Sequence, residues 1–302
     1  MNSAEQPVAI VTGAGGGIGR AHALAFAAAG VAVVVNDVGV PRDSDGASAG
    51  PAREVVDEIV ANGGAAIANT DDISDFDGAK RVVEQAVGEF GRLDTVVNNA
   101  GIVRDRMLVN MSESDWDAVI RVHLKGTFAT TQHAAAYWRG RAKAGEPVDA
   151  SVVNTTSSTG VYGNPGQANY GADKAGIAAF TIIAAMELER YGVRVNAISP
   201  TAMTRMTEGI AAVAKIAESR DLAPANVSPL VVWLAGPRAA GITGRIFAVS
   251  GGRITVLEGW VAGPMQERPE PWTIDELDHV VPSLVARAAP NARQDGTRPA
   301  AG

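Results

Sequence analysis

An apolar run, a glycine-rich turn and a helical stretch follow one another at the start of the chain. The apolar run is Val8–Val11, T-G-A-G-G-G-I-G occupies residues 12–19, and an alanine-rich stretch continues to about Ala29. Glycines in such a turn let the backbone approach a pyrophosphate, and the helix N-terminus supplies amide donors and partial positive charge. This order predicts a dinucleotide-binding βαβ unit. The residues expected at the cofactor here are Gly13, Gly17, Ile18 and Gly19.

The second predicted strand ends in an acidic residue. Val31–Val35 is apolar and runs into Asn36 and Asp37. Asp37 follows Gly13 at about the spacing at which an acidic residue binds the adenosine ribose diol. A carboxylate accepts hydrogen bonds from that diol and repels a 2′-phosphate, so Asp37 predicts NAD as the cofactor.

Apolar runs and helical stretches alternate as far as Gly252. Later strands are predicted at Ala65–Asn69, Thr95–Val97, Val153–Thr156, Arg194–Ile198 and Arg245–Val249. This alternation predicts an α/β fold: a single doubly wound Rossmann-type domain over residues 1–252, with a mostly parallel seven-stranded sheet and helices on both faces. Residues 253–302 are expected to form a C-terminal extension with a helix from Thr273, its last ~14 residues disordered.

Small and polar residues follow the strand at 95–97. The sequence N-N-A-G occupies residues 98–101, at a strand's carboxyl end, where open α/β sheets bind their ligands. Such residues allow close backbone approach, although an ordinary strand-to-helix turn is the alternative. The residues expected at the cofactor are Asn99, Ala100 and Gly101.

The stretch from Val153 to Lys174 carries the predicted chemistry. Ser157 follows the strand's carboxyl end, and Tyr170 and Lys174 are four residues apart, on one face of a predicted helix. A phenol with a pKa near ~10 is a weak base at neutral pH, and an adjacent ammonium is expected to lower that pKa. We therefore predict an acid/base site in which Ser157 holds a carbonyl or carbinol oxygen while Tyr170 moves its proton.

Two neighbouring features leave alternatives open. His123 lies in V-H-L-K-G-T-F, inside a long predicted helix from Ser112 to about Arg141. A histidine in an apolar helix is more often packed than catalytic, and we expect a structural or water-organising role. The weakly helical Thr201–Ala223 carries Met203 and Met206, which suit either a lid over an apolar substrate or plain packing.

Composition excludes several classes of function. The net charge of −7, from 26 basic and 33 acidic residues without a basic block, argues against nucleic acid or an anionic membrane as partner. The absence of cysteine excludes disulfides and thiolate chemistry, and the four histidines lack metal-ligand spacing, so no metal is expected. The longest apolar stretch, Ala175–Met186, is too short to span a bilayer. We expect a cytoplasmic protein acting on a small-molecule substrate.

These motifs, in this order, resemble those of the short-chain dehydrogenase/reductase family over about Pro7 to Gly252. The resemblance implies a nicotinamide cofactor, hydride transfer at a carbonyl or alcohol carbon, and Lys174 holding the cofactor ribose. It also implies a homodimer or homotetramer packed through the two long helices that end near Arg141 and Tyr191. The residues that it adds to the cofactor site, partly through D-D-I at 71–73, are Asp72, Ile73, Tyr170, Lys174 and Pro200.

A narrower resemblance concerns the substrate. The stretches V-V-V-N-D-V-G, N-A-G-I-V-R-D-R-M and G-V-Y-G-N-P-G-Q-A-N-Y are similar to the (3R)-hydroxyacyl-CoA dehydrogenase unit of the peroxisomal multifunctional β-oxidation enzyme, also called 17β-hydroxysteroid dehydrogenase type 4. This implies oxidation of a 3-hydroxyacyl-CoA. A steroid or other apolar alcohol, a 3-oxoacyl carrier-protein thioester, and a catalytically silent NAD-binding protein remain the alternatives. Two departures from the wider family are His123 in place of an asparagine and Thr201 in place of a glycine after Pro200.

Overall fold

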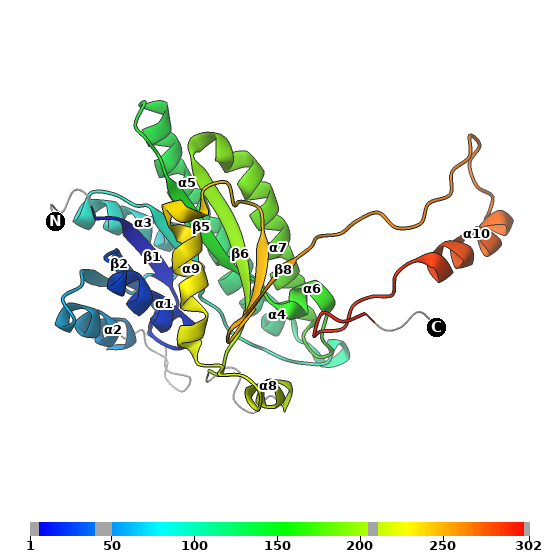
Figure 1. Cartoon of the computed structure of the whole chain (residues 1–302), viewed down its shortest axis with the longest axis horizontal. Coiled ribbons are helices and arrows are strands. Elements are labelled where there is room, and N and C mark those ends of the chain that lie inside the picture. Colours follow the sequence, from blue (N-terminus) through cyan, green and yellow to red (C-terminus); the bar gives the residue numbers. More distant parts are fainter. Residues whose placement is uncertain (1–5, 40–49, 205–210, 299–302) are drawn as a thin grey trace.

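An eight-stranded, mostly parallel sheet organises the molecule (Figure 1). The structure is a computed structural model that describes residues 6–39, 50–204 and 211–298. The strands are β1 (Val8–Thr12), β2 (Ala32–Asn36), β3 (Ala66–Asn69), β4 (Thr95–Asn98), β5 (Ala150–Thr155), β6 (Val193–Thr201), β7 (Ile246–Ser250) and β8 (Arg253–Leu257). Their order is β3-β2-β1-β4-β5-β6-β7-β8, so the winding reverses between β1 and β4, where such sheets bind ligands.

Helices cover both faces of this sheet. The α-helices of the described residues are α1 (Gly17–Ala28), α2 (Gly50–Ala61), α3 (Phe76–Phe90), α4 (Glu113–Ile120), α5 (Gly126–Lys143), α6 (Ser158–Tyr162), α7 (Ala168–Leu188), α8 (Ala211–Ala217), α9 (Ser228–Ala235) and α10 (Ile274–Arg287), the last of which lies away from the sheet (Figure 1). One hydrophobic cluster joins the sheet to α1, α2 and α9, and a second joins it to α3, α5 and α7. Every residue of β1, β2 and β4 is buried, as expected when both faces are covered. The predicted doubly wound fold is confirmed.

The sheet has one strand more than the sequence predicts. β8 pairs antiparallel with β7, with Ser250 opposite Arg253. Gly251 and Gly252 form the connection, and Gly251 has a φ of +55°. A Gly-Gly pair between two apolar runs is a hairpin signal. The sheet therefore continues into the region assigned to the C-terminal extension.

The long predicted helix from Ser112 is interrupted. Ser112 caps α4 as expected, in a capping box with Asp115, but the α-helical pattern gives way to a π-helical turn at Arg121–Lys125 before α5 begins. This turn contains His123. A Cβ on Gly126 would lie 2.1 Å from the side chain of Ile73, so α5 starts in close contact with the segment after β3.

The chain after β8 leaves the body, forms α10 and returns (Figure 1). On its return, Gln294 Nε2 donates a hydrogen bond to Thr159 Oγ1 over 3.3 Å. Disorder is expected for the last ~14 residues of the chain. The structure describes this segment as far as Arg298, and Gln294 within it contacts α6. Residues 299–302 lie outside the described residues. No helix within the described ranges is long and apolar enough to cross a membrane.

Candidate active site

The loops after β1 and β4 are fastened together at the carboxyl edge of the sheet. Thr12 Oγ1 accepts hydrogen bonds from the backbone N–H groups of Asn99 and Ala100 over 3.0 and 3.1 Å. The Asn99 amide donates back to the carbonyl oxygens of Thr12 and Gly13. A Cβ on Gly13, whose φ is +62°, would lie 2.6 Å from the Ala100 Cα, and one on Gly19 would lie 2.2 Å from the Gly13 carbonyl oxygen. Only glycine fits this cradle.

Asp37 lies beside the cradle at the end of β2. Its two carboxylate oxygens accept from the backbone N–H groups of Gly15 and Gly39, each over 2.9 Å. A Cβ on Gly15 would lie 2.8 Å from the Asp37 carboxylate, so the glycine loop and the carboxylate are in direct contact. Each oxygen keeps a lone pair with which it can accept from a ribose diol.

Four other residues predicted to bind the cofactor, Ile18, Asp72, Ile73 and Pro200, differ in their surroundings. Asp72 accepts from the Ser74 N–H after β3, and Pro200 is part of β6. Ile73 is buried in the core, and Ile18 packs against the other core cluster. The Ile73 side chain is thus enclosed, whereas Ile18 is only partly buried and keeps part of its side chain accessible.

Ser157, Tyr170 and Lys174 are brought together as the spacing predicts. Ser157 caps α6 directly after β5, and its side chain hydrogen bonds with Tyr170. Tyr170 and Lys174 lie in the first two turns of α7. The Lys174 ammonium donates to the Thr155 carbonyl oxygen over 2.8 Å and lies 5.5 Å from the centre of the Tyr170 ring. The ammonium is thus fixed beside the phenol by the end of the central strand.

The acidity of Tyr170 differs from expectation. Burial raises the pKa of the Tyr170 phenol to about 12, and the hydrogen bond with Ser157 only partly opposes this shift. The Lys174 ammonium was expected to lower this pKa, and the prediction is wrong for this structure. Desolvation penalises the phenolate more than its neighbours stabilise it.

A buried acidic residue that the sequence reasoning missed lies next to Lys174. Asp173 and His123 are almost fully buried, and the His123 Nδ1 lies 3.4 Å from an Asp173 carboxylate oxygen. Neither carboxylate oxygen has a hydrogen bond of ordinary geometry. The spacing could have revealed it, because Asn169, Asp173, Ile177 and Thr181 recur every four residues and form one buried stripe on α7.

Burial acts on this charged pair in opposite directions. It raises the pKa of the Asp173 carboxyl group and lowers the pKa of the Lys174 ammonium, while the opposite charge of each residue partly offsets the effect on the other. Both shifts disfavour the charged forms, as expected for ionisable groups removed from water. The site therefore contains a carboxylate whose charge depends on the lysine beside it.

His123 lies behind the Tyr170 ring. The two rings meet edge to face with their centres 5.5 Å apart, and the His123 Nε2 accepts from the Ile102 N–H over 2.7 Å. Burial and the Lys174 charge hold the pKa of His123 well below its usual range, so the ring is neutral near pH 7. A neutral ring bound to backbone agrees with the expected structural role.

We predict that His123→Asn loses less than ~10-fold in kcat/KM, far less than the ~10² or more typical of an acid/base residue. Asparagine keeps a polar side chain but cannot reproduce the ring contact with Tyr170. Steady-state kinetics across neutral pH provide the measurement, and the wild-type profile should show no histidine titration. A loss as deep as that of Tyr170→Phe would show that His123 transfers a proton.

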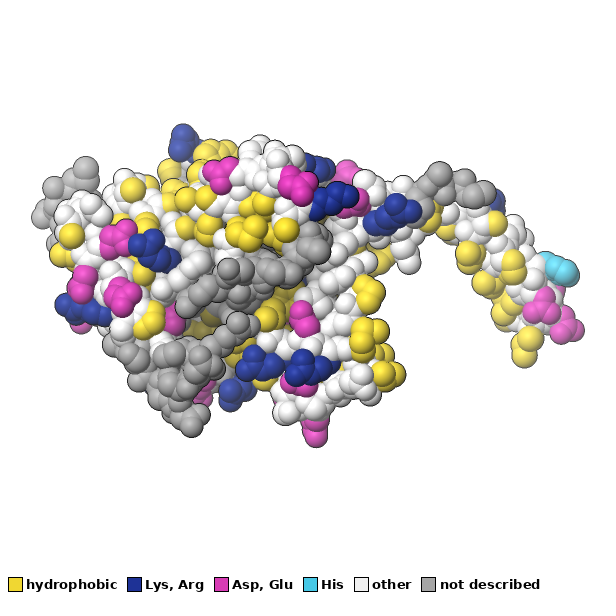
Figure 2. Space-filling view, turned by 90° about the horizontal axis from the view of Figure 1, so that it is seen from below, with side chains coloured by type: hydrophobic (Ala, Val, Ile, Leu, Met, Phe, Trp, Pro, Cys, Tyr) yellow, Lys and Arg dark blue, Asp and Glu magenta, His cyan; other side chains and the backbone are white. Residues whose placement is uncertain are grey.

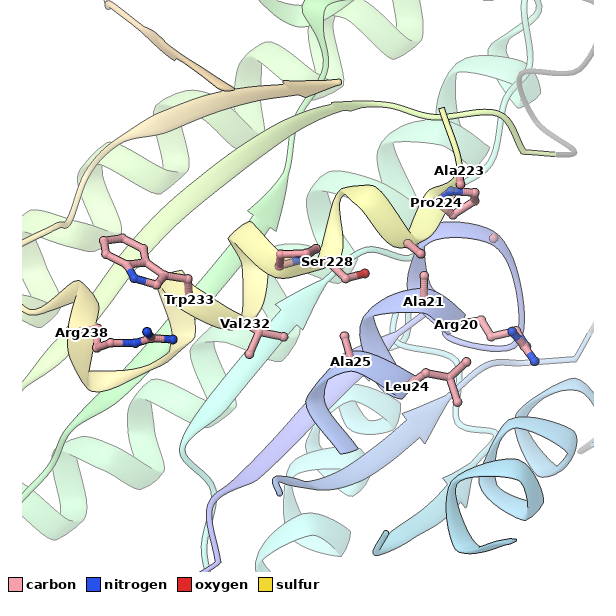
Figure 3. A pocket seen from close by; sticks show the side chains of 13 residues that line it. Arg20, Ala21, Leu24, Ala25, Ala223, Pro224, Ser228, Val232, Trp233 and Arg238 are labelled. Carbon is pink, nitrogen blue, oxygen red and sulfur yellow. The ribbon is translucent and has the colours of Figure 1, made fainter. Parts of the chain in front are cut away.

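A cleft of about 930 Å³ lies elsewhere, between α1 and α9 (Figure 3). Leu24 and Ala25 of α1 line it opposite Val232 of α9. Ser157, Tyr170 and Lys174 do not line this cleft, and of the residues predicted at the cofactor only Gly17 reaches it. The catalytic candidates thus lie outside this cleft, at the carboxyl edge of the sheet.

The family assignment follows from a family model, described as short chain dehydrogenase, that matches residues 7–214. The chain is a short-chain dehydrogenase. The matched span contains the glycine cradle, Asp37 and the Ser157-Tyr170-Lys174 set. This family membership makes the protein an oxidoreductase that acts on CH–OH groups with a nicotinamide cofactor.

Named relatives of this dehydrogenase agree with the narrower resemblance. It is 49% identical to the hydroxyacyl-CoA dehydrogenase ChsB1 of Mycobacterium tuberculosis, over 86% of this chain and 81% of the relative. It is 40% identical to the mouse peroxisomal multifunctional enzyme type 2, over 88% of this chain but only 35% of that enzyme. A crystal structure of a short chain dehydrogenase from Mycobacterium avium matches with a TM-score of 0.85 and 52% identity, covering 95% of this chain and 97% of the other.

Proposed function

We propose that this protein is an NAD-dependent dehydrogenase that oxidises a 3-hydroxyacyl-CoA to the 3-ketoacyl-CoA. The contact of Ser157, Tyr170 and Lys174 at the end of β5 carries the proposal, because these groups can bind and deprotonate one alcohol. The glycine cradle and Asp37 support the cofactor, and ChsB1, named as a hydroxyacyl-CoA dehydrogenase, supports the substrate class.

Each residue of the set has a distinct task. Ser157 hydrogen bonds with the substrate oxygen and orients it beside the Tyr170 hydroxyl. Tyr170 takes the alcohol proton during oxidation and returns it during reduction. Lys174, anchored on the Thr155 carbonyl oxygen, retains two N–H donors for a cofactor ribose. When bound, the nicotinamide cofactor accepts hydride from the alcohol carbon, or gives it back in the reverse direction.

Asp37 is predicted to select NAD over NADP. The Asp37 carboxylate, fixed by the Gly15 and Gly39 amides, repels a 2′-phosphate and accepts from a ribose diol. We expect wild-type kcat/KM to favour NAD by at least ~10-fold and Asp37→Ser to lose most of that preference, since one charge interaction of ~1.4 kcal/mol corresponds to tenfold. Asp57→Asn, at an exposed position of α2, is the control. Equal values for both cofactors in the wild type would contradict this assignment. Arg42, the arginine nearest to Asp37 in the sequence and the one able to weaken the preference, lies outside the described residues.

The substrate assignment is tested by a panel. The assay compares (3R)- and (3S)-hydroxyacyl-CoAs, a 17β-hydroxysteroid and simple secondary alcohols, with NADH absorbance as the readout. We expect a 3-hydroxyacyl-CoA to have the highest kcat/KM, with an advantage of at least ~10-fold, or ~1.4 kcal/mol of transition-state binding. If the steroid or a simple alcohol leads by that margin, the thioester assignment is wrong. Absence of turnover on the whole panel would favour a silent NAD-binding protein.

We also infer a cytoplasmic homo-oligomer that packs through α5 and α7. Phe128 on α5 and Ile183 and Met186 on α7 are 43%, 50% and 67% exposed and line one shallow depression. Exposed apolar patches of this kind are typical of subunit interfaces. Of the two methionines that suit either a substrate lid or plain packing, Met203 is partly exposed and Met206 lies outside the described residues.

A further inference from the structure

The last residues of β2 and β3 carry buried amide side chains next to the predicted adenosine end of the cofactor site. Asn36 of β2 and Asn69 of β3 lie opposite each other in the sheet and are 2% and 6% exposed. Asp37 follows Asn36 directly, and Asp72 lies three residues after Asn69. Buried amides require hydrogen-bond partners, because an unpaired polar group removed from water is costly.

Asn69 is the centre of a hydrogen-bond network at these strand ends. Its side-chain oxygen accepts from the Asn36 amide over 2.7 Å and from the Asp71 N–H over 3.0 Å. Its amide nitrogen donates to the Asp71 carboxylate over 2.9 Å and to the Gln85 side-chain oxygen over 2.7 Å. An asparagine side chain has two donor hydrogens and an oxygen with two lone pairs. All of them are engaged, so these contacts fix the orientation of Asn69.

The network connects three segments that meet at the cofactor edge of the sheet. The Asn36 amide also donates to the Asp71 carbonyl oxygen over 2.9 Å. The Asn36 carbonyl oxygen accepts from the Ala14 N–H of the glycine turn, also over 2.9 Å. The Asp37 N–H donates to the Asn69 carbonyl oxygen over 3.0 Å. The glycine turn, Asp37 and the segment after β3 therefore share one set of hydrogen bonds.

A salt bridge closes the network on the solvent side. Arg81 of α3 donates over 2.6 Å to the Asp71 carboxylate oxygen that does not accept from Asn69. The Arg81 side chain is 55% exposed and that of Asp71 is 23% exposed. Solvent and salt screen such a pair more strongly than they screen the buried amide contacts. The asparagines therefore hold the segment after β3 in place, and the arginine adds a smaller contribution.

The outer surface of the body offers a bound dinucleotide little orientation. Figure 2 shows acidic and basic side chains interspersed over the face that is seen from below. A mixed surface of this kind steers an anionic ligand less than a cleft lined by charges of one sign. Fixed groups at the strand ends, rather than a long-range field from that face, must orient the cofactor.

We propose that Asn69 is a positioning residue for the adenosine half of the nicotinamide cofactor, acting through Asn36 and Asp71. Its enclosed side chain holds the end of β2, which presents Asp37, and the segment after β3, which presents Asp72. A binding site that is already ordered loses less conformational freedom when its ligand binds. Loosening the two strand ends weakens adenosine binding and leaves the groups that transfer the proton in place.

This role differs from that of Asp37. The Asp37 carboxylate discriminates between NAD and NADP by its charge, so its removal changes the ratio of the two affinities. Asn69 fixes backbone that both cofactors use, so its removal weakens both by the same factor. The two assignments can therefore fail separately, and neither depends on the acyl-CoA substrate.

The test measures dissociation constants by calorimetry for NAD, NADP, ADP-ribose and nicotinamide mononucleotide, with competition for the weaker ligands. In Asn69→Ala the constants for NAD, NADP and ADP-ribose should each rise by at least ~10-fold, since several buried hydrogen bonds are lost. The constant for nicotinamide mononucleotide and the kcat at saturating NAD should stay within ~3-fold of the wild type. Lys80→Gln breaks an exposed pair with Glu84 on the same helix α3 and is the matched control.

A reciprocal exchange tests the same contact with both side chains retained. Asn69→Asp alone sets two carboxylates against each other and should weaken ADP-ribose binding as the alanine variant does. Adding Asp71→Asn places a donor opposite the new carboxylate, and should return the ADP-ribose affinity to within ~3-fold of the wild type. A double variant that binds ADP-ribose no better than Asn69→Asp would overturn the proposal.

Arg81→Gln keeps the proposal testable if the variants at position 69 do not fold. It removes the exposed partner of Asp71, and should raise the ADP-ribose constant by about 2- to 3-fold without changing that of nicotinamide mononucleotide. Unchanged ADP-ribose binding in a folded Asn69→Ala, or in Arg81→Gln where that variant has to decide, would overturn the proposal. So would equal losses for ADP-ribose and nicotinamide mononucleotide, because a merely structural residue weakens both halves of the site.

Discussion

Tyr170→Phe is expected to lower kcat by at least ~10²-fold while leaving NAD binding intact, because it removes only the hydroxyl that transfers the substrate proton. The ring keeps its edge-to-face contact with His123, so the surrounding structure should be retained. Turnover is measured with the best substrate of the panel, and NAD binding by calorimetry. Tyr162→Phe, which removes a hydroxyl from a tyrosine on α6, is the matched control.

The pH dependence provides a second readout for the same residue. Burial raises the pKa of Tyr170 to about 12, so the phenolate is a small fraction at neutral pH. At pH values below the pKa, the phenolate fraction grows about tenfold for each unit by which the pH rises. Alcohol oxidation by the wild type should therefore accelerate with rising pH. The residual activity of Tyr170→Phe should lack this slope. A phenylalanine variant with near-full activity, or one that keeps the wild-type slope, would show that another group transfers the proton.

Local sequence signals were sufficient for the fold and for most of the site. The glycine turn between a buried strand and a helix, Asp37 at the next strand end, and the spacing of Tyr170 and Lys174 each require one backbone geometry. Neighbouring parallel strands then place these residues at a common edge without further information. The family model matches the stretch that carries these residues, 7–214.

The features that could not be predicted from the sequence depend on contacts between distant segments of the chain. The interruption of the long helix at Arg121–Lys125 arises where His123 turns inward to Ile102 and Gly126 packs on Ile73. Gly126 beside Phe128 is a local signal of close packing, but the sequence does not show which segment it meets or that the helix is interrupted there. The raised pKa of Tyr170 likewise results from desolvation of the phenol in the folded chain, whereas sequence spacing reports only that Lys174 is near. Tertiary desolvation outweighed the local charge argument.

Lys174→Met is expected to reduce both catalysis and stability, for separable reasons. The ammonium sits beside the phenol and compensates the buried Asp173 carboxylate. Its loss should lower kcat/KM by at least ~10²-fold. Removing the positive charge that partly offsets the buried Asp173 carboxylate should also lower the free energy of unfolding near neutral pH, by up to about 3 kcal/mol. Adding Asp173→Asn to the same chain removes the unpaired charge, and should restore stability without restoring turnover.

The pH dependence of unfolding identifies the group responsible. Burial raises the folded-state pKa of Asp173 above its unfolded value near ~4, so its contribution to stability is fully present below that pH. The contribution is lost as pH rises through the folded-state pKa. Without the Lys174 charge this pKa rises further, so Lys174→Met should lose more stability at about pH 8 than at about pH 5.

Urea unfolding of the wild type, Lys174→Met and the double variant with Asp173→Asn at both pH values provides the measurement. The double variant should lack the pH-dependent loss because asparagine does not titrate. Equal losses at the two pH values would show that Asp173 is not the group left without a partner. If the double variant regained turnover along with stability, Lys174 would serve the fold alone, and the acid/base site would have to work without its ammonium.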